Sequence, residues 1–397
     1  QDIIRDPEKR RKLVVYINPP YAEAANRRTV VGTGDNRKNI SVTHTTYKHY
    51  LSQIGIAGRE LYAQFLIRIS TECNGCLLAS FTTLKYLNSY NFRKFREYFT
   101  PQHLGGFICP AYTFDNVRGE FPIGFNIWDT GVSNTWEKTT MDVFDKDGNY
   151  MFRAKSYYCS QFFRSINDWI ITTRNRDLSY TIGFMSAKGS DFQNQDYVFI
   201  INDKKQLPHP RGTEVSNKNI CEIAIYYTVR HIIDHTWLNH DDQFLYPNDG
   251  WQTNQEFQTD CLVYTLFHGQ NRISSEHGTN HWIPFTEDEV GAQEKFESHF
   301  MSDYLKGKHT PSTTPACAEG ELFAQGQSQT DAPAAPKLQF SPEAQAVMDA
   351  GRELWRYYHR QPIAKERPNA SFYDIRLYFQ GTKTTRSGKQ QMNTESQ

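Results

Sequence analysis

The residues with the clearest chemical potential form a short run, Asn18-Pro19-Pro20-Tyr21. The run follows Leu13–Ile17, an apolar and β-branched segment that predicts a buried strand. Proline fixes φ at about −65°, so the two prolines hold the turn rigid. An asparagine oxygen and a fixed backbone carbonyl can accept two hydrogen bonds from one amine, and Tyr21 offers a flat aromatic face. A strand-ending turn capped by asparagine is the purely structural alternative.

The segment Val15–Tyr21 resembles the catalytic signature of the adenine-specific amino-group DNA methyltransferases of restriction–modification systems. In that family Asn or Asp, two prolines and Tyr or Phe follow a sheet strand. The resemblance implies that the Asn18 oxygen and the Pro19 carbonyl take both hydrogens of the adenine amine and localise its lone pair. Tyr21 would stack on the flipped adenine. Moving the adenine out of the duplex costs a few kcal/mol, and stacking on one aromatic ring recovers about 1–3 kcal/mol. We therefore expect a second aromatic or apolar side chain against the other face of the base, which we call the second wall.

The expected second wall is Phe121. The family places an aromatic residue in a Phe-Pro step that opens a late strand, and Gly119–Phe125 resembles that step. Phe125 is the fallback, and ordinary core packing of Phe121 is the alternative. The resemblance covers residues 10–135.

The methyl donor that the resemblance implies is S-adenosylmethionine, which the family holds on a glycine-rich turn. No such turn precedes Asn18; Gly32-Thr33-Gly34-Asp35 lies too close to the motif, and Gly183–Gly189 has the wrong spacing. The sequence also starts at Gln1 without an initiator methionine. We therefore expect residues outside this chain to complete the donor site, either in an upstream half of the same protein or on a restriction or specificity subunit.

Two groups of basic residues are candidates for contact with double-stranded DNA, because phosphate contacts supply affinity without sequence. One group lies in the polar loop that follows the motif. The other lies on a predicted helix over 91–99, where positions three apart share a face. A solvated surface is the alternative for both. The candidates are Arg27, Arg28, Arg37, Lys38, Arg93 and Arg96.

We expect no metal site. Cys73-Asn74-Gly75-Cys76 has no second cysteine pair nearby to complete a zinc site. His231 and His235 are four apart on a predicted helix, but the glutamate of a His-Glu-x-x-His motif is missing.

The elements that must position these residues predict an α/β fold over 1–150, the methyltransferase catalytic part. Strands are expected at 13–17, 75–81, 105–110 and 121–128, with helices at 58–69 and 91–99. With the resemblance, this is the later-strand half of a Rossmann-like methyltransferase sheet.

The remainder predicts three further parts. Residues 151–305 suggest an α+β region for target recognition or spacing, with helices over 219–238 and 287–305. Residues 306–339 are rich in Thr, Ser, Pro, Ala, Gln and Gly, which is typical of a linker or disordered segment. Residues 340–397 predict a helix from the N-cap Ser341 to Tyr358, and then a loop-like tail.

Composition narrows the class of protein. Lys plus Arg and Asp plus Glu both number 44, which excludes a globally basic nucleic-acid coat but leaves local patches possible. No apolar run approaches the roughly 18 residues of a membrane helix. The 7 cysteines in 397 residues are scattered, as expected of reduced thiols in a soluble, cytoplasmic protein.

The sequence thus favours a site-specific adenine DNA methyltransferase, present as a partial chain. Two alternatives remain open at this point. One is a DNA-binding or specificity module without catalysis of its own. The other is methylation of a different amine, in cytosine, RNA or a protein glutamine, because the Asn-Pro-Pro-Tyr turn is shared among such enzymes.

Overall fold

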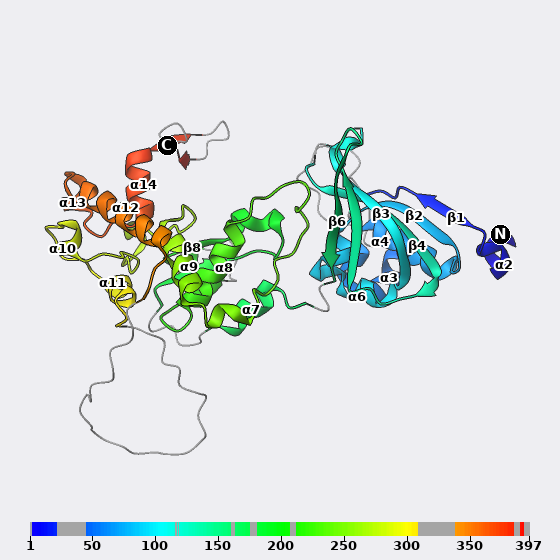
Figure 1. Ribbon diagram of the computed structural model, residues 1–397, viewed down its shortest axis with the longest axis horizontal. Coiled ribbons are helices and arrows are strands. Elements are labelled where there is room, and N and C mark those ends of the chain that lie inside the picture. The colour runs from blue at the N-terminus through cyan, green and yellow to red at the C-terminus, as the bar shows by residue number, and fades with distance from the viewer. Residues whose placement is uncertain are drawn as a thin grey trace, which may run out of the picture. The chain divides into compact units, whose positions relative to one another are not determined.

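The computed structural model describes residues 2–21, 45–115, 117, 119–159, 163–174, 181–206, 212–308, 338–384 and 390–392. They form two compact units (Figure 1). Unit 1 comprises Gln1–Ser165, Ser190–Gln193 and Asp234–Tyr246, and unit 2 comprises Ile166–Gly189, Asn194–Ile233 and Pro247–Gln397. This division differs from the domains expected from sequence, since residue 150 begins a strand of unit 1. Most of the expected linker, 309–337, lies outside the described residues.

Unit 1 contains a six-stranded mixed sheet, so the expected α/β character is confirmed. The strand order is β1-β2-β4-β3-β5-β6. β1 is parallel to β2, and β4 is antiparallel to both β2 and β3. The carboxyl ends of β1, β2 and β3 therefore meet the start of β4 at one edge of the sheet. The strands are β1 (Val14–Ile17), β2 (Leu77–Thr83), β3 (Pro101–Pro110), β4 (Pro122–Ser133), β5 (Lys138–Phe144) and β6 (Tyr150–Tyr158).

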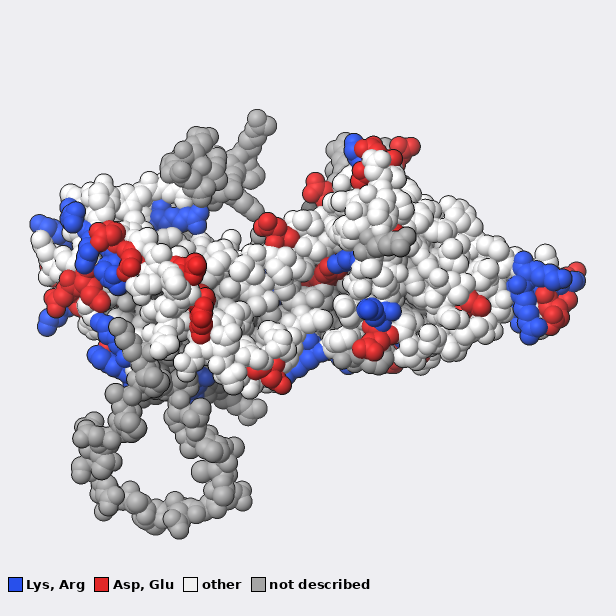
Figure 2. Space-filling view, in the orientation of Figure 1, with Lys and Arg blue, Asp and Glu red and all other residues white. Residues whose placement is uncertain are grey.

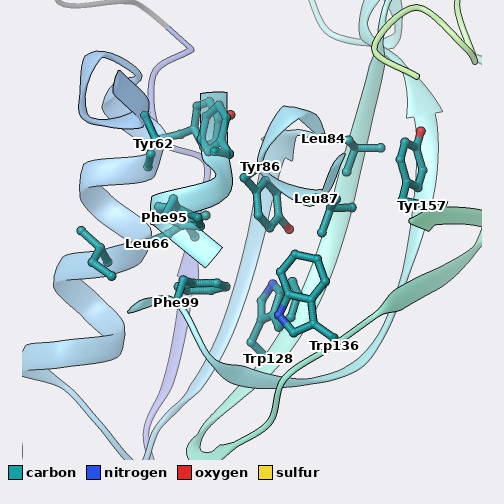
Figure 3. Packing of buried hydrophobic residues seen from close by; sticks show 14 of the residues in the cluster. Tyr62, Leu66, Leu84, Tyr86, Leu87, Phe95, Phe99, Trp128, Trp136 and Tyr157 are labelled. Carbon is teal, nitrogen blue, oxygen red and sulfur yellow. The ribbon is translucent and has the colours of Figure 1, made fainter. Parts of the chain in front are cut away.

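Helices α3, α4 and α6 cover one face of this sheet (Figure 1). Figure 3 shows the resulting core, in which Tyr62 and Leu66 of α4, Phe95 of α6 and Phe99, which directly follows α6, pack with Trp128 of β4. All five side chains are fully buried, and large aromatic groups of this kind dominate core energetics. The helical elements are α1 (Asp2–Arg5), α2 (Pro7–Arg10), α3 (Thr45–Ile54), η2 (Gly55–Arg59), α4 (Leu61–Glu72), α5 (Lys85–Asn88), η3 (Tyr90–Phe92), α6 (Arg93–Tyr98) and η4 (Ala111–Thr113).

The opposite face of the sheet carries a row of aromatic rings that crosses β1, β2, β4, β3, β5 and β6. Successive ring centroids lie 4.8–6.4 Å apart. Figure 2 shows that few charged side chains lie over the strands of unit 1 in this view. The ends of the row are the most exposed, with Tyr16 at 65% and Tyr150 at 50%. We call this set the aromatic row: Tyr16, Phe81, Phe125, Phe107, Phe144 and Tyr150.

Unit 2 combines a small antiparallel sheet, ordered β8-β7-β9, with a set of helices. The helix expected over 219–238 begins at Ile220 and ends at His231, and a second helix, α9, spans Gln255–Phe267. The elements are α7 (Ile166–Thr172), β7 (Gly183–Ser186), η5 (Phe192–Tyr197, whose first two residues belong to unit 1), β8 (Phe199–Ile201), η6 (Lys204–Gln206), β9 (Gly212–Val215), α8 (Ile220–His231), η7 (Asp249–Gln252), α9 (Gln255–Phe267), η8 (Ser275–His277), α10 (Glu287–Val290), α11 (Phe300–Leu305), α12 (Pro342–His359), α13 (Ile363–Glu366), α14 (Phe372–Gln380), β10 (Thr382–Thr384) and β11 (Gln390–Met392).

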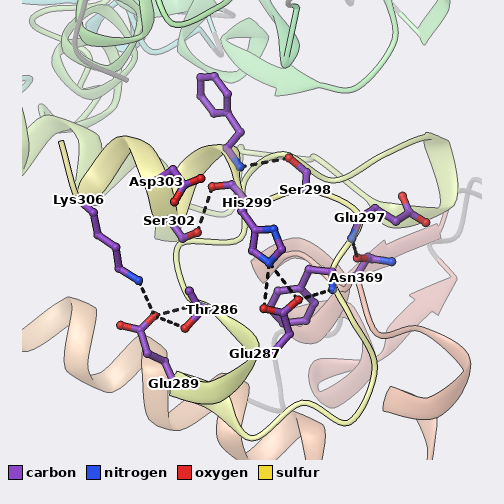
Figure 4. A network of polar contacts seen from close by, with 12 residues as sticks. Thr286, Glu287, Glu289, Glu297, Ser298, His299, Ser302, Asp303, Lys306 and Asn369 are labelled. Atoms are coloured by element: carbon purple, nitrogen blue, oxygen red, sulfur yellow. Dashed lines mark hydrogen bonds and ion pairs between the residues drawn. The ribbon is translucent and has the colours of Figure 1, made fainter. Parts of the chain in front are cut away.

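The single helix expected over 287–305 is wrong. Gly291 adopts a left-handed conformation with φ of 68° and ends α10 after one turn, and α11 begins only at Phe300. Side-chain hydrogen bonds hold the intervening loop instead (Figure 4). The Glu287 carboxylate lies 2.9 Å from His299 Nε2, and the Asn369 side-chain oxygen accepts from the Glu297 amide at 2.8 Å.

The C-terminal part was predicted correctly only in its first half. Ser341 caps α12 by accepting a hydrogen bond from the Ala344 amide at 3.1 Å, as expected. The loop-like tail is wrong, because 363–366 and 372–380 are helical. A reciprocal capping box between Ser371 and Asp374 starts the second of these helices, which sequence periodicity did not reveal.

Candidate functional site at the carboxyl edge of the sheet

The Asn-Pro-Pro-Tyr turn lies at the end of β1, where the sequence places it. Pro19 is buried, whereas Asn18 is exposed, so the corner is anchored while its amide faces solvent. The Tyr21 hydroxyl donates a hydrogen bond of 2.6 Å to Asn18 Oδ1. Since an amide oxygen has two lone pairs, Asn18 can keep this bond and accept a second hydrogen. The hydroxyl therefore orients the predicted acceptor.

The structure brings Tyr21 and Phe121 to one apolar cluster. Both side chains pack against the buried residues Cys109, Ala111 and Ile123. The Ala111 amide donates to the Phe121 carbonyl at 2.8 Å, which closes the end of the β3–β4 hairpin. Tyr21 and Phe121, the two residues expected to hold the base, thus pack against one cluster at the end of the sheet that carries Asn18, although about a hundred residues separate them in the sequence.

The ring of Phe121 is seated on a glycine. A Cβ atom at Gly119 would lie 2.3 Å from Phe121 Cε1, so any larger residue would displace the ring. Phe125, the fallback, occupies a different place. Its ring belongs to the aromatic row, 4.8 Å from Phe81 and 6.2 Å from Tyr16. Of these two candidates, Phe121 packs against the same buried cluster as Tyr21.

The candidate site is electrically neutral at its centre. Burial raises the pKa of the Tyr21 hydroxyl, and the neighbouring Cys109 and Tyr16 raise it further. Burial also raises the pKa of the Cys109 thiol to about 11. Both groups are therefore uncharged at neutral pH. An uncharged and partly aromatic surface suits a neutral planar ligand such as a base.

The sequence analysis did not identify His240 and Asp241. These residues lie in the segment 234–246, which belongs to unit 1, and His240 lies beside Phe121. The His240 ring lies 6.1 Å from the Phe121 ring. Its Nδ1 lies 2.9 Å from a carboxylate oxygen of Asp241, which is only 4% exposed. No spacing signal links these residues to the motif, because tertiary folding alone brings the segment 234–246 to unit 1.

The structure is compatible with DNA contact by some of the predicted basic residues and not by others. Arg93 is exposed, with its guanidinium 5.2 Å from the Tyr90 ring centroid, and stays a candidate for phosphate contact. The prediction for Arg96 is wrong. Its side chain is 4% exposed and donates hydrogen bonds to the Tyr86 and Ser89 carbonyls, each at 2.9 Å. Arg96 therefore stabilises the buried interior of unit 1 and is not available to bind phosphate. The loop candidates lie outside the described residues: Arg27, Arg28, Arg37 and Lys38.

The structure describes only some of the glycines considered for a donor turn. Gly183 begins β7 of unit 2 and Gly189 follows that strand, whereas Gly32 and Gly34 lie outside the described residues. Within the described ranges, no three His, Cys, Asp or Glu residues are grouped to hold a metal ion.

Comparison with known proteins does not identify a family for this chain. No family model matches the sequence, and no curated protein does. Among solved structures, the chain is similar to the ATP-dependent Type ISP restriction-modification enzyme LlaBIII bound to DNA, with 7% identity and a TM-score of 0.24. The match covers 46% of this chain and 15% of that chain, and a likeness this low defines neither fold nor function. None of the helices in the described part is long and apolar enough to cross a membrane.

Proposed function

We propose that this chain is the base-binding, amine-activating part of a DNA adenine methyltransferase. The observation that carries the proposal is the convergence at one sheet edge of three features. Asn18 presents an exposed amide oxygen on an anchored corner. Tyr21 orients that oxygen through a 2.6 Å hydrogen bond. Phe121 packs against the same buried cluster as Tyr21.

The chemistry follows from the acceptor pair. The amine of adenine is a poor nucleophile because its lone pair is delocalised into the ring. Asn18 Oδ1 and the Pro19 carbonyl would accept its two hydrogens and draw the nitrogen toward tetrahedral geometry. Because Pro19 is buried and both prolines restrict φ, little reorganisation is needed when the amine arrives. S-adenosylmethionine would supply the electrophilic methyl group when bound.

Tyr21 and Phe121 would hold the flipped base from two sides. One stack is worth about 1–3 kcal/mol by alanine substitution, and flipping costs a few kcal/mol. Two walls therefore offset a cost that one wall alone meets only in part. His240, held by Asp241, would support the outer side of Phe121.

The donor is proposed to be bound by residues outside this chain. The sheet of unit 1 supports this view, because the described strands leave the outer edge of β1 unpaired. Tyr16 and Val14 on this edge strand are 65% and 61% exposed, which is unusual for apolar side chains of an α/β sheet. We propose that β1-β2-β4-β3 are the later strands of a methyltransferase sheet, completed across β1 by the donor-binding half.

The test uses the complete gene product in a bacterial host that lacks DNA adenine methylation. Mass spectrometry of nucleosides from the host DNA should show N6-methyldeoxyadenosine. Asn18→Ala should lower its rate of formation by about 10²–10³-fold, the usual effect of removing one preorganised hydrogen-bonding group. Asn149→Ala is the matched control, since Asn149 is an exposed asparagine of unit 1 that hydrogen-bonds Asp145 away from the site.

Other outcomes would overturn the proposal in distinct ways. N4-methyldeoxycytidine alone would assign the same turn to a different amine. DNA binding without any methylated nucleoside would leave a recognition module. Full methylation by Asn18→Ala would remove the role assigned to the corner.

A further inference from the structure

A second candidate site lies in unit 2, far along the chain from the Asn-Pro-Pro-Tyr turn. It is an open pocket of about 430 Å³, within the volume range of small-ligand sites. β8 and the residues flanking it form one side, and the first turn of α14 forms another. Among the lining residues are Tyr197, Phe199, Gln206, Arg272, His277 and Tyr373.

The pocket combines aromatic rings with positive charge. The Arg272 guanidinium lies 4.4 Å from the ring centroid of Phe199, which is itself buried. Next to the pocket-lining Tyr197, which is 47% exposed, Lys188 Nζ lies 4.5 Å from the centroid of the Tyr197 ring. Exposed rings with cations beside them are the usual surface for stacking nucleic-acid bases.

Arg272 is held in a fixed orientation. Its Nε and Nη2 both donate to Gln270 Oε1, at 2.9 and 2.6 Å, and its backbone amide donates to the Ile200 carbonyl at 2.8 Å. Within the described part of the chain, no carboxylate pairs with this guanidinium. Nη1 is left for a ligand. A fixed and unneutralised guanidinium favours an anionic ligand or the acceptor edge of guanine.

The far wall of the pocket is also fixed in advance. The buried Asp374 carboxylate accepts from Ser274 Oγ at 2.6 Å, from the Ser275 amide at 2.9 Å and from the Ser371 amide at 3.0 Å. These bonds join η8, which carries His277, to the start of α14, which carries Tyr373. Little ordering is then required when a ligand binds.

We propose that this pocket binds a nucleotide, with the base against the Tyr197 and Tyr373 rings and Arg272 donating to a phosphate or to guanine. The planar aromatic rings favour a base, and the Arg272 guanidinium, which pairs with no carboxylate in the described residues, favours the negative charge of a phosphate. The inference that this nucleotide belongs to a strand of the DNA substrate rests on the proposed function. A free nucleotide shares the same chemistry, so the experiment includes both.

Binding is measured by fluorescence anisotropy with the full chain and a labelled mixed-sequence 16-mer, as a single strand and as a duplex. Arg272→Ala and Tyr197→Ala should each weaken binding by about 5- to 150-fold, the equivalent of one stacked base. Arg352→Ala is the matched control, because Arg352 also lies over a phenylalanine ring of unit 2, 5.4 Å from the Phe285 centroid, but does not line this pocket. Thermal unfolding of each variant checks the fold.

Further measurements assign the source and test the position. Photo-crosslinking of a 5-iodouracil oligonucleotide should map to Tyr197 or Tyr373. Competition by GMP or AMP at the affinity of the oligonucleotide would assign a free nucleotide. Competition that is at least tenfold weaker would assign the strand. Equal affinity of Arg272→Ala, Tyr197→Ala and wild type for oligonucleotide and mononucleotides would overturn the proposal.

The two proposals fail independently. Methyl transfer is tested by Asn18→Ala in unit 1, whereas oligonucleotide binding by the pocket is tested by Arg272→Ala and Tyr197→Ala in unit 2. Unimpaired binding by the pocket variants alongside active methyl transfer would remove only the pocket. Absence of methyl transfer with impaired binding by those variants would remove only the methyltransferase.

Discussion

The hydrogen bond between Tyr21 and Asn18 allows the role of the turn to be divided between a ring and a hydroxyl. Tyr21→Phe keeps the aromatic face and removes only the group that donates to Asn18 Oδ1 at 2.6 Å. Tyr21→Ala removes both. Burial raises the pKa of this hydroxyl, so it remains a protonated donor throughout the neutral and mildly alkaline range in which turnover would be measured.

The expected magnitudes follow from the position of the two residues. Tyr21 is half-buried and Asn18 is exposed, so the bond should contribute the ordinary net value of about 0.5–1.5 kcal/mol. Tyr21→Phe should then lower kcat by about 2- to 12-fold. Loss of the ring adds about 1–3 kcal/mol, so Tyr21→Ala should lower kcat/KM by about 10- to 2,000-fold.

The assay is the initial rate of methyl transfer by the complete gene product, measured as a double-mutant cycle. If the hydroxyl acts only by orienting Asn18, Tyr21→Phe should have no further effect in the Asn18→Ala background. Equal fold-losses in both backgrounds would refute the orienting role. A rise in kcat/KM for Tyr21→Phe would refute it more directly, because the hydroxyl would then compete with the amine for the acceptor.

Two further predictions concern stability. A Cβ at Gly106 would lie 2.3 Å from the Phe125 carbonyl oxygen, so Gly106→Ala should destabilise unit 1 by about 1–3 kcal/mol in urea unfolding. Gly58→Ala, whose Cβ would meet ordinary contacts from 3.6 Å, should change stability by less than about 1 kcal/mol; equal losses would contradict the steric argument. In unit 2, burial first, and then His231 and Arg376, lower the pKa of His268 to about 4. The unfolded chain takes up this proton below its ordinary pKa of 6.5 while the native imidazole stays neutral, so stability should fall as pH falls from 6.5 toward 4. His268→Gln should reduce the loss of thermal stability between pH 7 and pH 5, and an unchanged loss would exclude His268 as its source.

Local sequence patterns were sufficient to predict the strands and turns that position the candidate site. β1, β2 and β4 and the following turns were predicted from short apolar runs bounded by prolines and glycines, and each formed near its expected place. Their signals are local, because strand propensity and turn chemistry depend on neighbouring residues. Predictions that depended on distant packing failed. The spacing of Arg93 and Arg96 predicted a basic helical face, but the Arg96 side chain is buried and donates hydrogen bonds to the carbonyls of Tyr86 and Ser89.

The sequence alone determined the candidate chemistry of this protein, since a diproline corner with an asparagine and a tyrosine is a covalent feature of the chain. Only the tertiary structure decided which aromatic residue joins Tyr21. Phe121 lies just before β4 and packs against Cys109, Ala111 and Ile123, whereas Phe125, four residues later within β4, belongs to the aromatic row. The returning segment with His240, and the pocket around Arg272, likewise depend on contacts between residues distant in sequence. Such contacts are set by the packing of the whole chain, which leaves no periodic mark on the sequence.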